Sequence, residues 1–291
     1  MAKIPDLANN GSSSLKIICD FSPPRGGTPS LIGDLDGLNP DIVSVAYNPG
    51  KSVRVNPVAA AAWIKANTKQ DVVFTLATRD MNKVAIQSLL LGAQLLGLQN
   101  IVIVEGDGLS IRDRERFKAV YDFQPTSLIE SVRDMNQGKD FRGLKLRVAT
   151  DFSVGATIDM GRPSDSEIPL AVRKAQTGAK FFLAQAEFDP SVIARFRADF
   201  ESHFDKGHAP PVFYGVQILA EDGIIFGNVP QGTRSELESG RSGEEIALEL
   251  IQNLMDQGVR TVYLVPPIFR GGRRDYDSAR RVIESARRLA S

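Results

Sequence analysis

Asp20 is a carboxylate placed where a short apolar run ends and a stiff turn begins. The segment IICDFSPPRGG covers residues 17–27, with two prolines that fix the backbone after Asp20 and two glycines that allow close approach. On a strand, Asp20 and Cys19 must face opposite sides. A carboxyl group whose surroundings keep it protonated can act as a general acid near neutral pH. The alternative interpretation is that Asp20 caps the following turn or pairs with Arg25.

Other polar side chains follow the remaining apolar runs, each near the point where a strand is expected to end. Polar residues at such positions often do no more than meet water, so the acidic ones are the stronger candidates for chemistry. The set consists of Tyr47, Asn48, Thr78, Arg79, Glu105, Asp107, Asp151, Ser153, Gln185, Glu187, Gln217 and Arg270.

Eight short apolar runs are expected to be strands, and helical periodicity fills most of the sequence between them. The expected strands cover residues 15–21, 41–47, 71–77, 100–106, 144–152, 179–188, 212–219 and 260–267. The clearest helices are expected over residues 81–97, 127–137, 168–177, 190–202, 244–257 and 276–290.

This alternation predicts a parallel sheet whose outer face is covered by helices. Eight such strands can close into a (β/α)8 barrel, so we predict the α/β class with a single barrel domain over residues 1–291. Residues 1–14 are expected to form a flexible N-terminal segment. An open doubly wound sheet is the alternative, but no G-x-G-x-x-G motif follows the first strand. In a barrel, the polar residues after the strands would meet at one mouth, where active sites of this fold lie.

Composition excludes several classes of protein. Lys plus Arg and Asp plus Glu both number 35, so the formal net charge is zero and no global basic surface predicts nucleic-acid binding. A single cysteine, Cys19, excludes an internal disulfide and a cysteine-based zinc site, and His203 and His208 lack further ligands, so we expect no metal. The N-terminus lacks the apolar core of a signal peptide, and no run approaches a membrane span of about 18 residues. We therefore expect a cytoplasmic protein without a membrane partner.

Four segments, taken in order, resemble motifs of the methylenetetrahydrofolate reductase family. CDFSPPR (19–25) is similar to the E-F-F-P-P-R of that family, and VEGD (104–107) is similar to its R-G-D. FFLAQAEFD (181–189) resembles its T-Q-F-F-F-D, and SGEEIALELIQNLMDQGV (242–259) resembles its helix before the eighth strand.

The resemblance implies an oxidoreductase of one-carbon metabolism that binds FAD and takes a hydride from NADH or NADPH. Its substrate would be a 5,10-methylene-tetrahydropterin, either tetrahydrofolate or a methanopterin-type relative, which it would reduce to the 5-methyl form. Asp20 would be the general acid, and Asp107 would lie against the pterin and the flavin. The resemblance implies substrate contacts for Gln185, Gln217 and Arg270, and cofactor contacts for Glu105, Thr157 and Lys174.

Departures from the family pattern gather on the flavin side. Asp20 replaces Glu, Glu105 replaces Arg, and Ala46, Val73 and Thr157 lie where the family has Thr, His and Tyr. The flavin is then held differently or absent, with direct hydride transfer from the nicotinamide. The alternatives are a related one-carbon carrier, a non-redox pterin-binding methyl-transfer protein that has lost flavin, or a barrel lyase that binds a substrate phosphate.

Two further features concern ligands and partners. A carboxylate at Glu105 repels phosphates, so a bound phosphate or polyglutamate tail is expected at FRGGRR (269–274), with Arg270 as the residue to test. The segment LLLGAQLLG (89–97) is apolar on nearly all faces, which favours a homo-oligomer.

Overall fold

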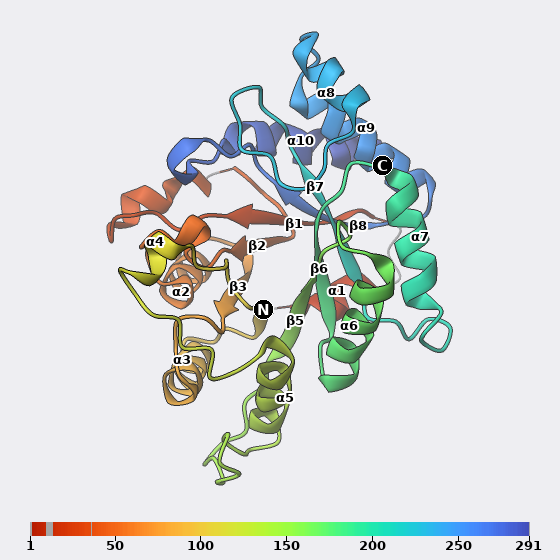
Figure 1. Cartoon of the computed structure of the whole chain (residues 1–291). Helices are drawn as coiled ribbons and strands as arrows, with labels where there is room; N and C mark the ends of the chain where they lie inside the picture. Colours follow the sequence, from red (N-terminus) through yellow and green to blue (C-terminus); the bar gives the residue numbers. More distant parts are fainter. Residues whose placement is uncertain (1, 10–13, 36, 291) are drawn as a thin grey trace.

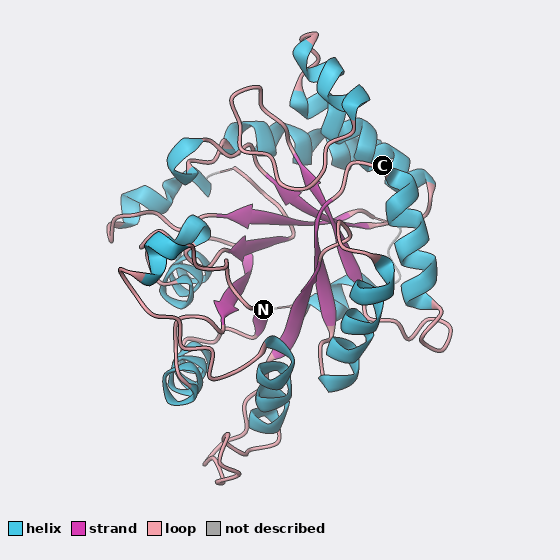
Figure 2. Ribbon diagram, in the orientation of Figure 1, coloured by secondary structure: helices cyan, strands magenta, loops and turns pink. Residues whose placement is uncertain are grey.

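The protein is a closed barrel of eight parallel strands surrounded by helices, seen in a computed structural model that describes residues 2–9, 14–35 and 37–290 (Figures 1 and 2). The strands are paired in chain order, and β1 also pairs with β8. They are β1 Lys16–Phe21, β2 Ile42–Val45, β3 Asp71–Ala77, β4 Asn100–Val104, β5 Ser153–Ile158, β6 Phe181–Ala186, β7 Val212–Gln217 and β8 Thr261–Val265. The (β/α)8 barrel predicted from the sequence is confirmed.

Helices cover the outside of the barrel, and the six expected ones are present within a few residues of their predicted bounds. They are α3 Lys83–Leu95, α5 Pro125–Asn136, α6 Ser164–Thr177, α7 Pro190–Glu201, α9 Gly243–Asp256 and α10 Tyr276–Leu289. The structure adds α1 Ile4–Asn9, α2 Pro57–Asn67, α4 Ile111–Arg114, α8 Gln231–Glu238 and the 3-10 turns η1 Pro29–Leu35, η2 Pro49–Lys51 and η3 Arg270–Gly272. Helix α2 begins at a typical start signal, an Asn followed by a Pro. The Asn56 side chain accepts a hydrogen bond from the Val58 amide, and Pro57 is the first residue of the helix.

The fifth strand lies at 153–158, so the prediction of a strand over residues 144–152 is wrong. The predicted run is a surface loop in which Leu144 and Val148 are 59% and 71% exposed. Asp151 and Ser153 therefore precede β5 or begin it, instead of following it. Asp151 pairs with Lys3 at 2.5 Å, close to the N-terminal helix, and takes no part in the barrel mouth.

The barrel interior is filled by apolar side chains that alternate along the strands, including Ile18, Val73, Phe181 and Phe213. Gly155 on β5 makes room for Phe181, because a Cβ there would lie 2.3 Å from its ring. A second, larger core lies between the strands and the helices, and Cys19 belongs to it, as the strand alternation predicts.

The N-terminal helix closes the barrel from below. Ile4 of α1 is fully buried against the interior residues, and its amide donates to the Asn100 side chain, whose own amide donates to the Ala2 carbonyl. Residues 4–9 are helical and packed against the barrel through Ile4, and the flexibility expected of the N-terminal segment stays a prediction. Residues 1 and 10–13 of that segment lie outside the described residues.

Helix α3 leaves several apolar side chains in contact with solvent. Val84, Leu91, Leu95 and Leu96 are all exposed, with Leu95 at 87%. A homo-oligomer that covers this face stays a prediction. None of the described helices combines the length and the apolar character that a membrane crossing requires.

Candidate active site

Asp20 lies in the barrel mouth and is held by two donors. It is 5% exposed and shares the inward face of β1 with Ile18. The Tyr263 hydroxyl donates to Asp20 Oδ1 at 3.0 Å, and Arg274 Nε donates to Oδ2 at 3.1 Å. Both carboxylate oxygens therefore accept a hydrogen bond, and the carboxylate and the guanidinium form a nearly buried ion pair.

The partner of Asp20 is Arg274, not the Arg25 of the alternative interpretation, and the substrate contact expected of Arg270 stays a prediction. The loop after β8 folds back on itself, with Ile268 bridging to Arg274 and with Gly271 and Gly272 at φ of 80° and 79°. This turn exposes Arg270 and returns Arg274 to the mouth. Sequence reasoning singled out this arginine-rich loop but did not predict the contact between Arg274 and Asp20, because that contact depends on the path of the turn.

Arg54, from the loop after β2, fixes the loops around this ion pair. Its guanidinium donates to the carbonyls of Pro23 and Gly271 at 2.9 and 3.1 Å and to the Ser52 hydroxyl at 3.0 Å. Gly272 is required for this contact, because a Cβ there would lie 2.3 Å from Arg54 Nη2. Burial, together with the charges of Arg274 and Arg25, lowers the pKa of Arg54.

Two tyrosines, the buried Tyr276 and the partly buried Tyr263, complete the surroundings of Asp20. Tyr276 accepts a hydrogen bond from the Ser22 amide at 3.0 Å, and its ring lies 5.6 Å from that of Phe21. Burial raises the pKa of Tyr276 and of Tyr263, and the nearby Asp20 carboxylate raises both further. Both phenols therefore stay protonated near neutral pH and serve as fixed hydrogen-bonding groups.

The mouth is open on the opposite side, after β4. Glu105 and Asp107 are exposed, and no ion pair reaches either within the described part of the chain. Gly106, at φ 94°, lets this loop approach β3, since a Cβ would meet Ala77 and Arg79 at 3.2 Å. Arg79 Nη1 donates to the Asp107 carbonyl at 2.9 Å, which fixes the backbone there but leaves the carboxylate free.

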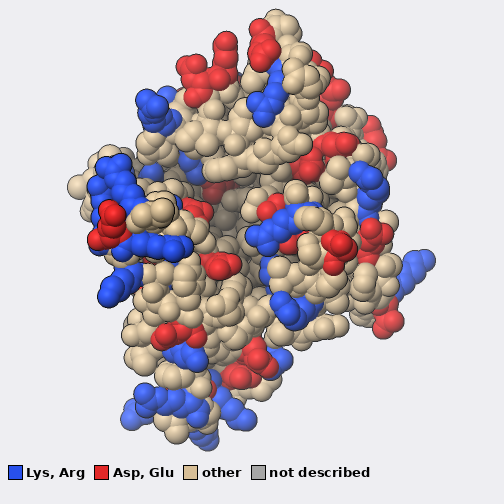
Figure 3. Space-filling view, in the orientation of Figure 1, with Lys and Arg blue, Asp and Glu red and all other residues tan. Residues whose placement is uncertain are grey.

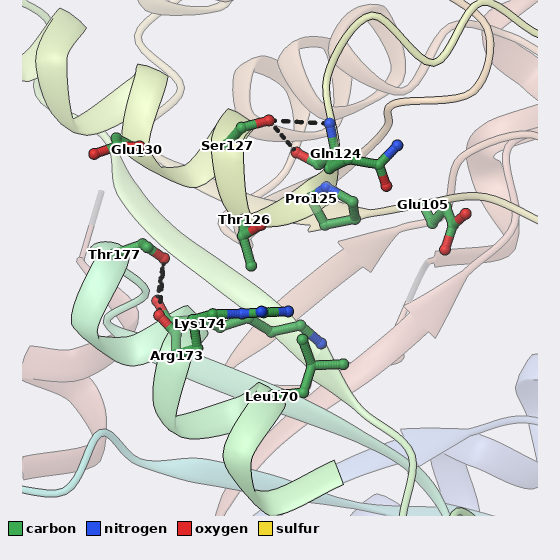
Figure 4. A pocket seen from close by; sticks show the side chains of 10 residues that line it. All are labelled: Glu105, Gln124, Pro125, Thr126, Ser127, Glu130, Leu170, Arg173, Lys174 and Thr177. Carbon is green, nitrogen blue, oxygen red and sulfur yellow. Dashed lines mark hydrogen bonds between the residues drawn. The ribbon is translucent and has the colours of Figure 1, made fainter. Parts of the chain in front are cut away.

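A cavity of about 380 Å³ lies between α5 and α6 (Figure 4). Lys174 Nζ donates to the Thr157 carbonyl at 2.7 Å, and burial lowers the pKa of Lys174. Glu105 lines the same cavity, so the three residues expected at a cofactor are close together. The lining residues are Glu105, Gln124, Pro125, Thr126, Ser127, Glu130, Leu170, Arg173, Lys174 and Thr177.

This set of side chains fits the phosphate groups of a nucleotide cofactor. Arg173 and Lys174 supply two cations, and the N-terminus of α5 faces the same space (Figure 4). The Glu105 carboxylate suits a hydroxyl or ring N–H group rather than a phosphate.

The sequence profile described as methylenetetrahydrofolate reductase matches residues 3–219, about three quarters of the chain. The chain belongs to the methylenetetrahydrofolate reductase family. Among solved structures it is similar to an uncharacterized protein from Clostridium thermocellum that binds two copies of 5-methyl-5,6,7,8-tetrahydrofolic acid. The TM-score is 0.68 at 13% identity, covering 95% of this chain and 96% of that one, a likeness that concerns the fold. No curated protein matches the sequence.

Within this methylenetetrahydrofolate reductase family member, the two glutamines expected at the substrate have different surroundings. Gln185 is exposed at the end of β6, next to a bulge that Gly215 permits, since a Cβ on Gly215 would lie 2.5 Å from the Ala184 carbonyl. Gln217 is buried, and its amide holds the loop after β7 by donating to the Ile224 carbonyl and accepting from the Phe226 amide, at 2.7 and 2.8 Å. Only one amide hydrogen of Gln217 is left for a ligand.

Proposed function

We propose that this protein reduces a 5,10-methylene-tetrahydropterin to the 5-methyl form, with Asp20 as the general acid. The observation that carries this proposal is the buried Asp20 carboxyl group at the mouth of a barrel that belongs to the methylenetetrahydrofolate reductase family. Tetrahydrofolate is the carrier to test first, because the similar clostridial protein binds 5-methyl-tetrahydrofolate.

Asp20 would protonate a nitrogen of the five-membered ring, which opens that ring to an electrophilic iminium; hydride addition to the methylene carbon then yields the methyl group. In the free protein Arg274 occupies Oδ2 of Asp20. The substrate must therefore displace the guanidinium before this oxygen can carry the proton. Tyr263 keeps Oδ1 fixed meanwhile, so the carboxyl group rotates little.

The cavity between α5 and α6 would hold the diphosphate of FAD, with Arg173 and Lys174 as its cationic contacts. Bound flavin would supply hydride chemistry by accepting two electrons from NADH or NADPH. Glu105 would contact a ribose or ring group, and Asp107 would lie toward the pterin. Thr157 contributes its carbonyl, which orients Lys174.

The test is oxidation of NADH or NADPH that depends on methylene-tetrahydrofolate, with protein to which FAD has been added. Asp20→Asn should lower kcat by about 100-fold or more, the range for loss of a general acid, while 5-methyl-tetrahydrofolate still binds. Asp205→Asn, at an exposed carboxylate on the far side of the barrel, is the matched control and should leave kcat unchanged. Equal turnover of Asp20→Asn and the wild type would exclude the acid assignment.

A second candidate is a non-redox pterin-binding protein. The Arg274–Asp20 contact favours it, because Arg274 already occupies the oxygen of Asp20 that would carry the proton. In that case 5-methyl-tetrahydrofolate binds, yet no reduced nicotinamide is oxidised in the presence of FAD or FMN.

A further inference from the structure

A second cavity, of about 430 Å³, opens beside the mouth at the ends of β2 and β3. Tyr47, Arg79 and Asp80 form its inner wall, and Phe117 and Lys118 border it from the segment after β4. The proposed reaction uses none of these side chains.

The inner wall of this cavity is rigid and electrically balanced. Arg79 is 3% exposed and forms a bidentate ion pair with Asp80, at 2.6 and 2.7 Å. Burial and the Asp80 carboxylate, which bonds its hydroxyl, raise the pKa of Tyr47 to about 12. Because Asp80 is neutralised by Arg79, the wall does not repel an anion.

The segment that borders the cavity at Phe117 and Lys118, in contrast, carries excess positive charge. Four exposed cations follow one another on residues 112–118, and we call them the basic strip: Arg112, Arg114, Arg116 and Lys118. Only Asp113 and Glu115 oppose them there, and Asp113 already pairs with Lys51 at 2.8 Å. Figure 3 shows Lys and Arg side chains gathered over α4, on the side of the molecule that carries the strip.

The segment that carries the basic strip is bonded at both ends to residues that line the cavity, Lys51 and Arg79. Lys51 Nζ donates to the Gly108 carbonyl at 3.0 Å, and the Val120 amide donates to the Arg79 carbonyl at 2.7 Å. Lys51, which makes the first of these contacts, and Tyr121, next to Val120, have left-handed backbones with φ of 60° and 49°. Side chains with such backbones cluster at binding sites, where the surrounding structure maintains the strain.

We propose that this cavity and the basic strip bind a chain of anionic groups that extends from the ligand at the barrel mouth. The shared chemistry is a row of negative charges: the carboxylates of an oligo-γ-glutamyl tail or the phosphates of a nicotinamide dinucleotide. The connection to a pterin at Asp20 rests on the proposed function, whereas binding of the anionic chain itself does not. Phe117 and Tyr47 supply apolar ring surfaces for the part of the ligand between the charges.

The experiment compares dissociation constants by calorimetry for four probes. They are 5-methyl-tetrahydrofolate with one and with three glutamates, free tri-γ-glutamate, and NADPH. The variant is Arg116→Gln/Lys118→Gln, and the matched control is Lys145→Gln/Arg147→Gln, with the same spacing on the exposed loop before β5.

If the tail is a glutamate chain, three glutamates should improve binding by about tenfold over one. The strip variant should lose this gain, and the control should keep it. If NADPH alone weakens in the strip variant, the site takes the dinucleotide phosphates. Binding of every probe with the same constant to the strip variant and the wild type would overturn the inference.

Free tri-γ-glutamate and NADPH separate this inference from the proposed function. If neither pterin form binds but either anionic probe binds through the strip, the inference stands and the proposed function fails. If 5-methyl-tetrahydrofolate binds equally with one or three glutamates, and the dissociation constant of NADPH is the same for the strip variant and the wild type, the proposed function stands and the inference fails.

Discussion

The two sides of the barrel mouth are built differently. On the side of β1 and β8, the Asp20 carboxylate is buried and bonded at both oxygens, and Arg54 fixes the loops around it. After β4, Glu105 and Asp107 are exposed beside an open cavity. On the closed side the groups are held in place before a ligand arrives and only the Arg274 guanidinium has to be displaced, whereas the open side depends on a ligand to complete it. We therefore assign the reacting groups to the closed side and cofactor binding to the open side.

The largest expected effect is the contrast between neutralising a carboxylate on each side. Asp20→Asn should reduce kcat by about 100-fold or more, because a general acid is lost. Glu105→Gln should change kcat by less than about threefold, since an exposed carboxylate is largely screened by solvent. Steady-state kinetics of both variants test this, and a greater loss in Glu105→Gln would reverse the assignment of the two sides.

The second largest effect is expected on the free energy of unfolding when the ion pair of the closed side is broken. Arg274→Met leaves the buried Asp20 charge without its partner and should lower the free energy of unfolding at pH 7 by about 3 kcal/mol. The double variant Asp20→Asn/Arg274→Met should recover most of this loss, because no charge is then buried. Urea unfolding of the single and double variants measures the coupling. Independent, additive effects would mean that the ion pair does not hold the mouth together.

A smaller effect is expected for Lys174, on the open side. Lys174→Gln should weaken FAD binding by about tenfold, the value of one charge-assisted contact. Because burial lowers the pKa of Lys174 below the ordinary 10.5, its charge is lost at a lower pH than that of an exposed lysine. FAD affinity of the wild type should therefore fall with rising pH below 10.5, while that of Lys174→Gln should not. Fluorescence titrations over this pH range decide whether Lys174 contacts the cofactor.

The smallest effect is expected for Arg270. This arginine is exposed, whereas Arg274 of the same loop contacts Asp20. Arg270→Gln should alter KM for methylene-tetrahydrofolate by less than about twofold, the range for an exposed charge. A change of tenfold would show that the loop after β8 rearranges when substrate binds.

The sequence was sufficient for the barrel but not for every strand. Seven strands were predicted because their apolar runs are strong, whereas β5, with the residues SVGATI, is rich in small residues. Gly155 is present there because Phe181 fills the space inside the barrel, a requirement that comes from another strand.

The candidate site shows the same limit. Asp20 was predicted because a carboxylate at the end of a buried strand stands out locally. Its partners Tyr263 and Arg274 are 243 and 254 residues away in the sequence, and nothing in the local pattern distinguishes Arg274 from its neighbours in the loop. Long-range pairs of this kind follow from barrel closure, which joins β8 to β1.

Helix α1 closes one end of the barrel, and this limits how ligands reach Asp20. Ile4 packs among the interior side chains, and Asn100 bonds to the backbone at Ala2 and Ile4. Helix α1 therefore closes the end of the barrel where the strands begin. Among the described residues, α1 closes this end of the barrel, so a ligand of Asp20 enters and leaves at the other end, where the strands end. In the proposed reaction the hydride donor, the one-carbon carrier and the product would all use that entrance, so the loops around it would set the order in which they enter and leave.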